Sequence, residues 1–284
     1  MNKKLLTLFG LKYNPFGLDL PADGFLVTPR LEHFFWRVEN SLVRDGGVAL
    51  VLGEAGSGKS VALRLLIEAL QAQEDVVVGV LSRPQSGLAD FFREMGEIFG
   101  AEIKPHNRWA GFKVLRQIWQ DHIDTRAIRP VLIIDEAQQT PTEVLSELRV
   151  LSSTRLDSRV ILSVVLAGDL RLLERFRQPE LIPLASRIRF RLPLEPASSD
   201  ELLAYLEHLL TAAGNSQLMT PELKRTLVDH SRGNLRVLVN MANELLTAAA
   251  RKGLAQLDEK LFLELYDMTK VARPVQRAPA RRKP

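Results

Sequence analysis

The chain carries a glycine-rich octapeptide between a short apolar run and a segment with helical spacing. Residues 53–60 read GEAGSGKS, the run before them reads VALVL, and the segment after them reads VALRLLIEAL. The pattern predicts a phosphate-binding loop, because its glycines let backbone N–H groups surround a polyphosphate at a helix N-terminus. We expect Lys59 to reach the β and γ phosphates of ATP and Ser60 to ligate Mg²⁺. The predicted nucleotide-binding residues are Gly53, Glu54, Ala55, Gly56, Ser57, Gly58, Lys59, Ser60 and Val61.

A second motif places two adjacent carboxylates at the end of an apolar run. Residues 131–136 read VLIIDE and end in Asp135 and Glu136. Ligands of open α/β sheets bind beyond the carboxyl ends of the strands, so these side chains should face the octapeptide. We expect Asp135 to hold Mg²⁺ together with Ser60, and Glu136 to orient and deprotonate the attacking water as a catalytic residue beside Lys59.

Apolar runs rich in β-branched residues alternate with segments of helical period along the first two thirds of the chain. This alternation is typical of an α/β fold, here a P-loop core with a parallel five-stranded sheet covered by helices on both faces. The predicted strands are residues 48–52, 76–81, 131–134, 160–167 and 188–192, and the predicted helices are 59–71, 88–99, 109–124 and 143–152.

After Pro193 the strand signal stops and four helical segments follow. They predict a small C-terminal all-helical lid domain. Their start signals are a capping box of Ser198 with Glu201, Thr220 before Pro221, and the cap residues Asn234 and Asp258. We therefore expect an N-terminal segment at 1–29, the α/β nucleotide-binding domain at 30–194, the helical lid domain at 195–270 and a tail at 271–284.

The net charge of +4 comes from the tail, which reads VARPVQRAPARRKP with five basic residues and no acid. Without it the chain is close to neutral, so its bulk charge does not indicate nucleic acid. The tail lacks apolar residues for a core and is predicted to be disordered. The apolar runs fall short of the roughly 20 residues that a membrane helix needs. With no cysteine, the expectation is a cytoplasmic protein without a membrane span.

The two motifs together resemble those of AAA+ ATPases, and the chain looks most like the ExeA-like group and the TniB, TnsC and MuB type ATPases of transposons. Residues 9–16, FGLKYNPF, are similar to the opening of ExeA-like proteins, and residues 147–151 and 165–168 are similar to their stretch after the carboxylate motif. The resemblance implies self-assembly into a ring or helical filament on duplex DNA. It also implies a transposase and a target-selection protein as partners.

Three further residues acquire roles only through this resemblance. Arg187 in LASRI is similar to the arginine finger that completes a neighbouring subunit's site, and Arg236 in GNLRVL is similar to sensor 2, which reaches the γ-phosphate. Family members commonly carry Gly-Gln at sensor 1, whereas this chain has Gly168-Asp169. An aspartate there adds negative charge near the γ-phosphate unless Mg²⁺ or an arginine offsets it. For Arg187, which lies in an arginine-rich stretch, a solvated surface is the alternative.

Three functions remain open from the sequence. The first is an ATPase that assembles on DNA and recruits or activates a transposase, with Arg83, Arg93, Lys104 and Arg108 as candidate DNA contacts or ordinary surface charges. The second is a secretion-associated ATPase of the ExeA type, which in that family carries a membrane span and a peptidoglycan-binding part. The third is a nucleotide-dependent binding module without significant hydrolysis, against which Glu136 argues.

Overall fold

A computed structural model describes residues 3–17, 20–21, 24–101, 103, 108–154 and 159–266, excepting the side chains of residues 3, 4 and 108. The chain divides into two compact units. One contains Leu26–Ala197 and Gly233–Arg236, and the other contains residues 1–25, 198–232 and 237–284. The predicted tail at 271–284 lies outside the described residues. No helix in the described ranges is long and apolar enough to span a membrane.

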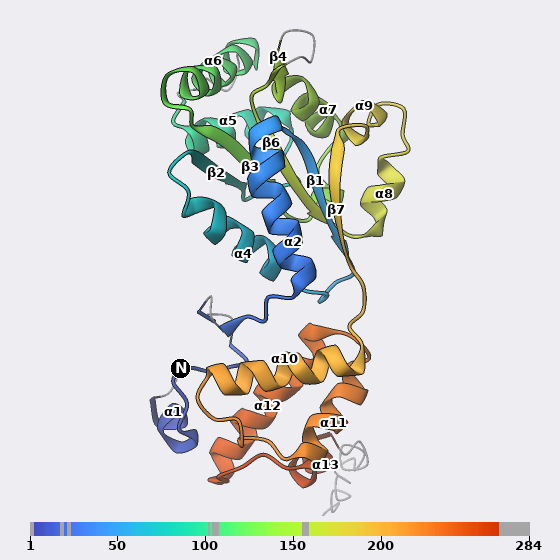
Figure 1. Ribbon diagram of the computed structural model, residues 1–284. Helices are drawn as coiled ribbons and strands as arrows, with labels where there is room; N and C mark the ends of the chain where they lie inside the picture. Colours follow the sequence, from blue (N-terminus) through green and yellow to red (C-terminus); the bar gives the residue numbers. More distant parts are fainter. Residues whose placement is uncertain are drawn as a thin grey trace, which may run out of the picture. The chain divides into compact units, whose positions relative to one another are not determined.

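The first unit is built on a five-stranded sheet in which every pairing is parallel. The strand order is β2-β3-β6-β1-β7 (Figure 1). The predicted parallel sheet is therefore confirmed. Its strands are β1 (Gly47–Gly53), β2 (Val76–Leu81), β3 (Arg129–Ile134), β6 (Ser163–Gly168) and β7 (Ile188–Leu194).

Helices cover both faces of this sheet, with α2 and α4 on one face and α5, α6 and α7 on the other (Figure 1). The strands are buried on both sides, which explains why they read as continuous apolar runs rather than as alternating ones. The helical elements are α2 (Pro29–Arg37), the π-helical turn η2 (Val38–Leu42), α3 (Val43–Asp45), α4 (Lys59–Gln71), α5 (Leu88–Phe99), α6 (Arg108–Arg126), the 3₁₀ turn η3 (Ala137–Gln139), α7 (Thr142–Leu151), α8 (Leu170–Arg175) and α9 (Ile182–Ala185).

The predicted fourth strand, 160–167, begins too early. In the structure β6 starts at Ser163, and Val160 belongs to a short antiparallel ladder of β4 (Ser153–Thr154) with β5 (Arg159–Val160). The backbone N–H groups of Ile161 and Leu162 both donate to the Ser152 oxygen, at 2.8 and 3.3 Å. These two residues are therefore bonded to the end of α7 and cannot pair with the central sheet.

The second unit is helical and contains α1 (Lys3–Phe9), α10 (Ser199–Ala212), α11 (Pro221–Ser231), most of α12 (Leu235–Lys252) and α13 (Glu259–Tyr266). The predicted caps are present: Ser198 and Glu201 form a complete capping box, Thr220 accepts from the Leu223 N–H, and Asp258 accepts from the Leu261 N–H.

Residues near the N-terminus pack on these helices, and this packing was not predicted from the sequence. The Lys12 N–H donates to the Ala213 oxygen at 2.9 Å, and Asn14 Nδ2 donates to Asn243 Oδ1 at 2.9 Å. Asn215 Nδ2 also donates to the Phe9 oxygen at 2.7 Å. The FGLKYNPF stretch thus serves to fasten the N-terminal residues to the helical unit.

Candidate nucleotide-binding site

The octapeptide forms a loop between β1 and α4 whose backbone requires glycine. Gly56 and Gly58 have φ angles of 85° and 97°, which residues with a Cβ rarely adopt. Lys59 is buried, and its Nζ donates to the backbone oxygens of Gly53 at 2.8 Å and Glu54 at 3.0 Å. A buried ammonium held by neutral carbonyls favours an anionic ligand, because an uncompensated buried charge is costly. The loop therefore suits a polyphosphate.

The two predicted metal ligands lie in direct contact. Ser60, in the first turn of α4, donates its hydroxyl to Asp135 Oδ2 at 2.8 Å. Hydroxyl and carboxylate oxygens are ligands that Mg²⁺ prefers, with water and nucleotide phosphates completing the octahedron. The pair therefore fits a Mg²⁺ ion bound together with ATP, and Ser60 and Asp135 would hold that ion.

Glu136 follows in an unusual backbone conformation. Its φ angle is 51°, in the left-handed region, and its N–H donates to Asp135 Oδ1 at 2.8 Å. Gln138 Nε2 donates to Glu136 Oε2 at 2.6 Å. The Gln138 side chain also accepts a longer bond, 3.4 Å, from the Asp169 N–H at the end of β6. Gln138 thus links the carboxylate motif to the sensor 1 position, which the sequence analysis missed.

Asp169 stands at the position expected for sensor 1 and is paired with an arginine. The guanidinium of Arg171 donates through Nε at 2.9 Å and Nη2 at 2.5 Å to Asp169 Oδ2. These bonds from Arg171 hold the pKa of Asp169 below its ordinary value, and the positive charge of Lys59 acts in the same direction. The negative charge at this position is therefore offset by an arginine, as an aspartate near a phosphate requires.

The loop lies against residues 233–236, which belong to the same unit. Asn234 Nδ2 donates to the Ala55 oxygen at 2.9 Å, while Asn234 Oδ1 caps α12 by accepting from the Arg236 N–H at 3.0 Å. A Cβ at Gly56 would lie 2.3 Å from Asn234 Oδ1, so the close approach requires glycine. Arg236, the predicted sensor 2, is the second residue of α12 and lies in the turn that follows Asn234, and its side chain is exposed.

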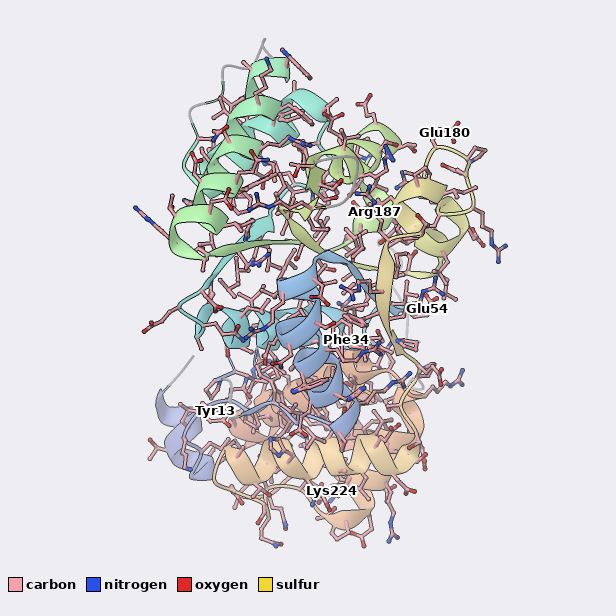
Figure 2. The ribbon with its side chains drawn as sticks, turned by 45° about the horizontal axis from the view of Figure 1, so that its top comes forward. Tyr13, Phe34, Glu54, Glu180, Arg187 and Lys224 are labelled. Atoms are coloured by element: carbon pink, nitrogen blue, oxygen red, sulfur yellow. The ribbon has the colours of Figure 1, made fainter. Side chains whose placement is uncertain are left out.

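Arg187, the predicted finger, lies far from its own chain's loop. It precedes β7, which runs parallel to β1 and pairs Leu194 with Gly53. Arg187 and Glu54 consequently lie at opposite ends of the strands (Figure 2), roughly 20 Å apart at about 3.3 Å per residue. Its Nη1 donates to the Arg149 oxygen at 2.7 Å and Ser152 Oγ at 3.0 Å, at the end of α7. Arg187 cannot complete the site of its own chain.

Two other arginines of the same stretch bind backbone carbonyls and were not predicted to do so. Arg175 Nη1 donates to the Gln138 oxygen at 2.7 Å, and Arg189 Nη1 donates to the Gly46 oxygen at 3.0 Å. Arg175 therefore fixes the backbone that carries Gln138. These hydrogen bonds could not be predicted from the local sequence, because their carbonyl partners lie far away along the chain.

Of the four candidate DNA contacts, the structure describes the side chains of Arg83 and Arg93. Arg83 is exposed after β2, while Arg93 forms a salt bridge with Asp90 at 2.9 Å, which weakens its positive potential. Lys104 lies outside the described residues, as does the side chain of Arg108 at the start of α6.

Comparisons with known proteins match this part of the chain to a family. Residues 43–176, which include the loop and the carboxylate motif, match the AAA domain family. The chain is 30% identical over 249 residues to General secretion pathway protein A of Aeromonas hydrophila, covering 86% of this chain. It spans 45% of that relative's length.

The fold is shared with solved structures of low sequence identity. The Aeropyrum pernix ORC2 protein, in ADPNP-ADP complexes, has a TM-score of 0.70 at 18% identity, over 91% of this chain and 72% of that one. Domain III of the Thermotoga maritima replication initiation protein DnaA has a TM-score of 0.60 at 19% identity, over 88% and 97%. Residues 43–176 thus match the AAA domain family, and the chain is similar to General secretion pathway protein A and, in fold, to ORC and DnaA proteins.

Proposed function

We propose that this chain is a Mg²⁺-dependent ATPase that hydrolyses ATP to ADP and phosphate. The observation that carries the proposal is the contact of Ser60 with Asp135 beside Glu136, because it places a metal-binding pair next to a carboxylate that can serve as a base. Mg²⁺, when bound, neutralises negative charge on the phosphates. Lys59 and the loop N–H groups bind the β and γ phosphates.

In the reaction the oxygen of a water molecule attacks the γ-phosphorus and the bond to the β-phosphate oxygen breaks. Glu136 orients this water and accepts its proton, and Gln138 holds the Glu136 carboxylate in place. Arg236, as sensor 2, and Arg187 of a neighbouring subunit supply positive charge to the γ-phosphate as it leaves. Asp169 occupies sensor 1 as an ion pair with Arg171.

Replacing Glu136 by Gln tests the assignment of the base. Glu136→Gln keeps Lys59, Ser60 and Asp135, so it should bind ATP with an unchanged Kd but lose at least about 100-fold in phosphate release. Lys59→Ala should lose ATP binding itself. Nucleotide titration and steady-state phosphate release give the two readouts, and a Glu136→Gln protein with parental turnover would refute the assignment.

We propose further that ATP-bound subunits assemble on duplex DNA as a ring or filament in the cytoplasm. The assembly recruits or activates a transposase together with a target-selection protein. Hydrolysis of ATP then disassembles it. The resemblance to the transposon ATPases supports this. Structures of similar fold include the Aeropyrum pernix ORC1 protein in complex with DNA, at a TM-score of 0.67 and 16% identity over 89% of this chain and 68% of that one. The proposal predicts a DNA mobility shift with ATP that is lost with ADP. Deleting residues 271–284 should weaken binding without removing its nucleotide dependence.

A secretion-associated ATPase is the second candidate, favoured by the 30% identity to General secretion pathway protein A. Turnover measured with and without duplex DNA separates the candidates. Stimulation by DNA supports the first, whereas turnover without any DNA binding at low salt supports the second. Negligible turnover in every condition would leave a nucleotide-dependent binding module.

A further inference from the structure

Helix α6 carries two stacked aromatic rings with cations beside them, the exposed Trp109 and Phe112, which is half-buried against the core. Trp109 is 64% exposed, and its ring lies parallel to that of Phe112, with centroids 5.6 Å apart and an interplanar angle of 5°. Lys113 Nζ lies 4.9 Å from the Trp109 centroid, and the Arg116 guanidinium carbon lies 4.9 Å from the Phe112 centroid. We call Trp109, Phe112, Lys113 and Arg116 the α6 platform.

Contacts with α5 and α7 hold the helix that carries the platform. Leu115 and Trp119 of the same helix are fully buried, and Trp119 packs edge-on against Phe99 of α5 with ring centroids 5.2 Å apart. Arg116 Nη1 also donates to the Val150 oxygen at 2.6 Å, near the end of α7. The exposed ring of Trp109 is therefore presented by a helix that is held in place and can bind a ligand with little ordering cost.

The charge around the platform distinguishes it from an ordinary exposed tryptophan. Residues 108–120 contain no acid, and the first one along α6, Asp121, accepts a hydrogen bond from Gln117 at 2.8 Å. Trp36 on α2 is equally exposed, at 60%, but its helix carries Glu32 and it stacks only loosely on His33, at 6.4 Å. Of these two helices, α6 is the one in which two stacked aromatic rings lie beside two cations within a stretch that contains no acid.

We propose that the α6 platform binds a nucleic-acid strand by stacking an unpaired base on Trp109, while the exposed Lys113 faces its phosphates. Bases offer flat rings and the backbone offers negative charge, so one ligand satisfies both features. An acidic protein would satisfy the cations alone. The inference rests on the proposed DNA binding and adds the form of DNA preferred, which is duplex containing an unpaired segment.

The test compares the full chain's affinity, with ATP, for a paired duplex and for the same duplex with a central unpaired bubble. Trp109→Ala should weaken binding to the bubble DNA about tenfold or more and change binding to the paired duplex less than about threefold, because stacking acts on the unpaired base. Trp109→Phe should retain most of the affinity. Trp36→Ala is the matched control and should bind like the parent.

A spectroscopic readout separates stacking from a structural role. In a Trp36→Phe background the remaining indoles are the platform's Trp109 and the buried Trp119. Bubble DNA should quench the fluorescence emission of the exposed Trp109. In a separate measurement, Lys113→Ala should reduce the magnitude of the slope of log affinity against log salt concentration by about 0.7 to 0.9.

The outcomes distinguish the proposed binding of duplex DNA from the proposed stacking of a base on the α6 platform. Parental affinity of Trp109→Ala for bubble DNA, with DNA binding otherwise intact, would overturn the platform and leave the DNA function standing. Trp109-dependent binding of bubble DNA without binding of paired duplex would overturn the duplex function and keep the platform. A loss of subunit assembly in Trp109→Ala without DNA, measured by light scattering, would reassign the platform to a subunit contact.

Discussion

At the scale of single residues, Gln138 is fixed from three directions. Its Nε2 donates to Glu136, its Oε1 accepts from the Asp169 N–H, and Arg175 binds its backbone oxygen. A Cβ at position 168 would lie 2.6 Å from Gln138 Oε1, so Gly168 leaves the space that this amide occupies. The orientation of Glu136 therefore depends on Gln138, a residue outside the phosphate-binding loop.

Substituting Gln138 should change catalysis more than ATP binding. Gln138→Ala should lower kcat about tenfold with a KM for ATP within about twofold of the parent, because the base loses its orientation while the loop stays intact. Gln138→Glu replaces the amide donor by a carboxylate that repels Glu136, so it should lower kcat at least as much as Gln138→Ala. Parental turnover in either variant would contradict the link.

The ion pair of Asp169 with Arg171 predicts a coupled effect on nucleotide affinity. In Arg171→Ala the pKa of Asp169 should rise toward its ordinary value, although the carboxylate stays ionised at neutral pH and then repels phosphate. ATP affinity measured by titration should fall about two- to fivefold, the range typical of an exposed pair. The double variant Asp169→Asn, Arg171→Ala should recover the parental affinity; additive losses would show that the two residues act separately.

At the scale of elements, the sequence predicted the strands and long helices well because these are governed by hydrophobic periodicity. Helices α4 and α5 have the predicted bounds, whereas the short helices α8 and α9 were not predicted. The contacts of Gln138, Arg171 and Asn234 could not be predicted either. Asn234, for example, was identified as a helix cap, but its bond to Ala55 joins residues 179 positions apart and depends on the tertiary fold.

This double role of Asn234 gives a prediction with a matched control. Asn234→Ala should lower the free energy of unfolding by about 1 kcal/mol, as expected for a lost cap, and should weaken ATP binding because the loop loses its tie to α12. Thr220→Ala removes the cap of α11, which has no bond to the loop, and should cost similar stability while leaving ATP affinity unchanged. Equal ATP affinities in both variants would limit Asn234 to capping.

At the scale of the whole molecule, Arg187 is separated from its own loop, so the role proposed for it as an arginine finger requires a second subunit. Arg187→Ala and Lys59→Ala proteins should each be inactive alone, and mixing them should partly restore ATP turnover, since some interfaces then combine an intact loop with an intact finger. Failure of all mixtures, with both proteins folded and assembling, would restrict Arg187 to its bonds with the end of α7.

The left-handed backbone of Glu136 implies a compromise between stability and activity. A non-glycine residue at a φ of 51° costs about 1 kcal/mol that glycine would avoid. Glu136→Gly should therefore raise the denaturation midpoint while abolishing turnover. Ala127→Gly relieves the same strain at a φ of 55° on an exposed position and should stabilise the fold with turnover unchanged. If both variants behave in this way, the glutamate at position 136 lowers stability in exchange for the proposed hydrolysis, whereas the alanine at position 127 lowers it without any effect on turnover.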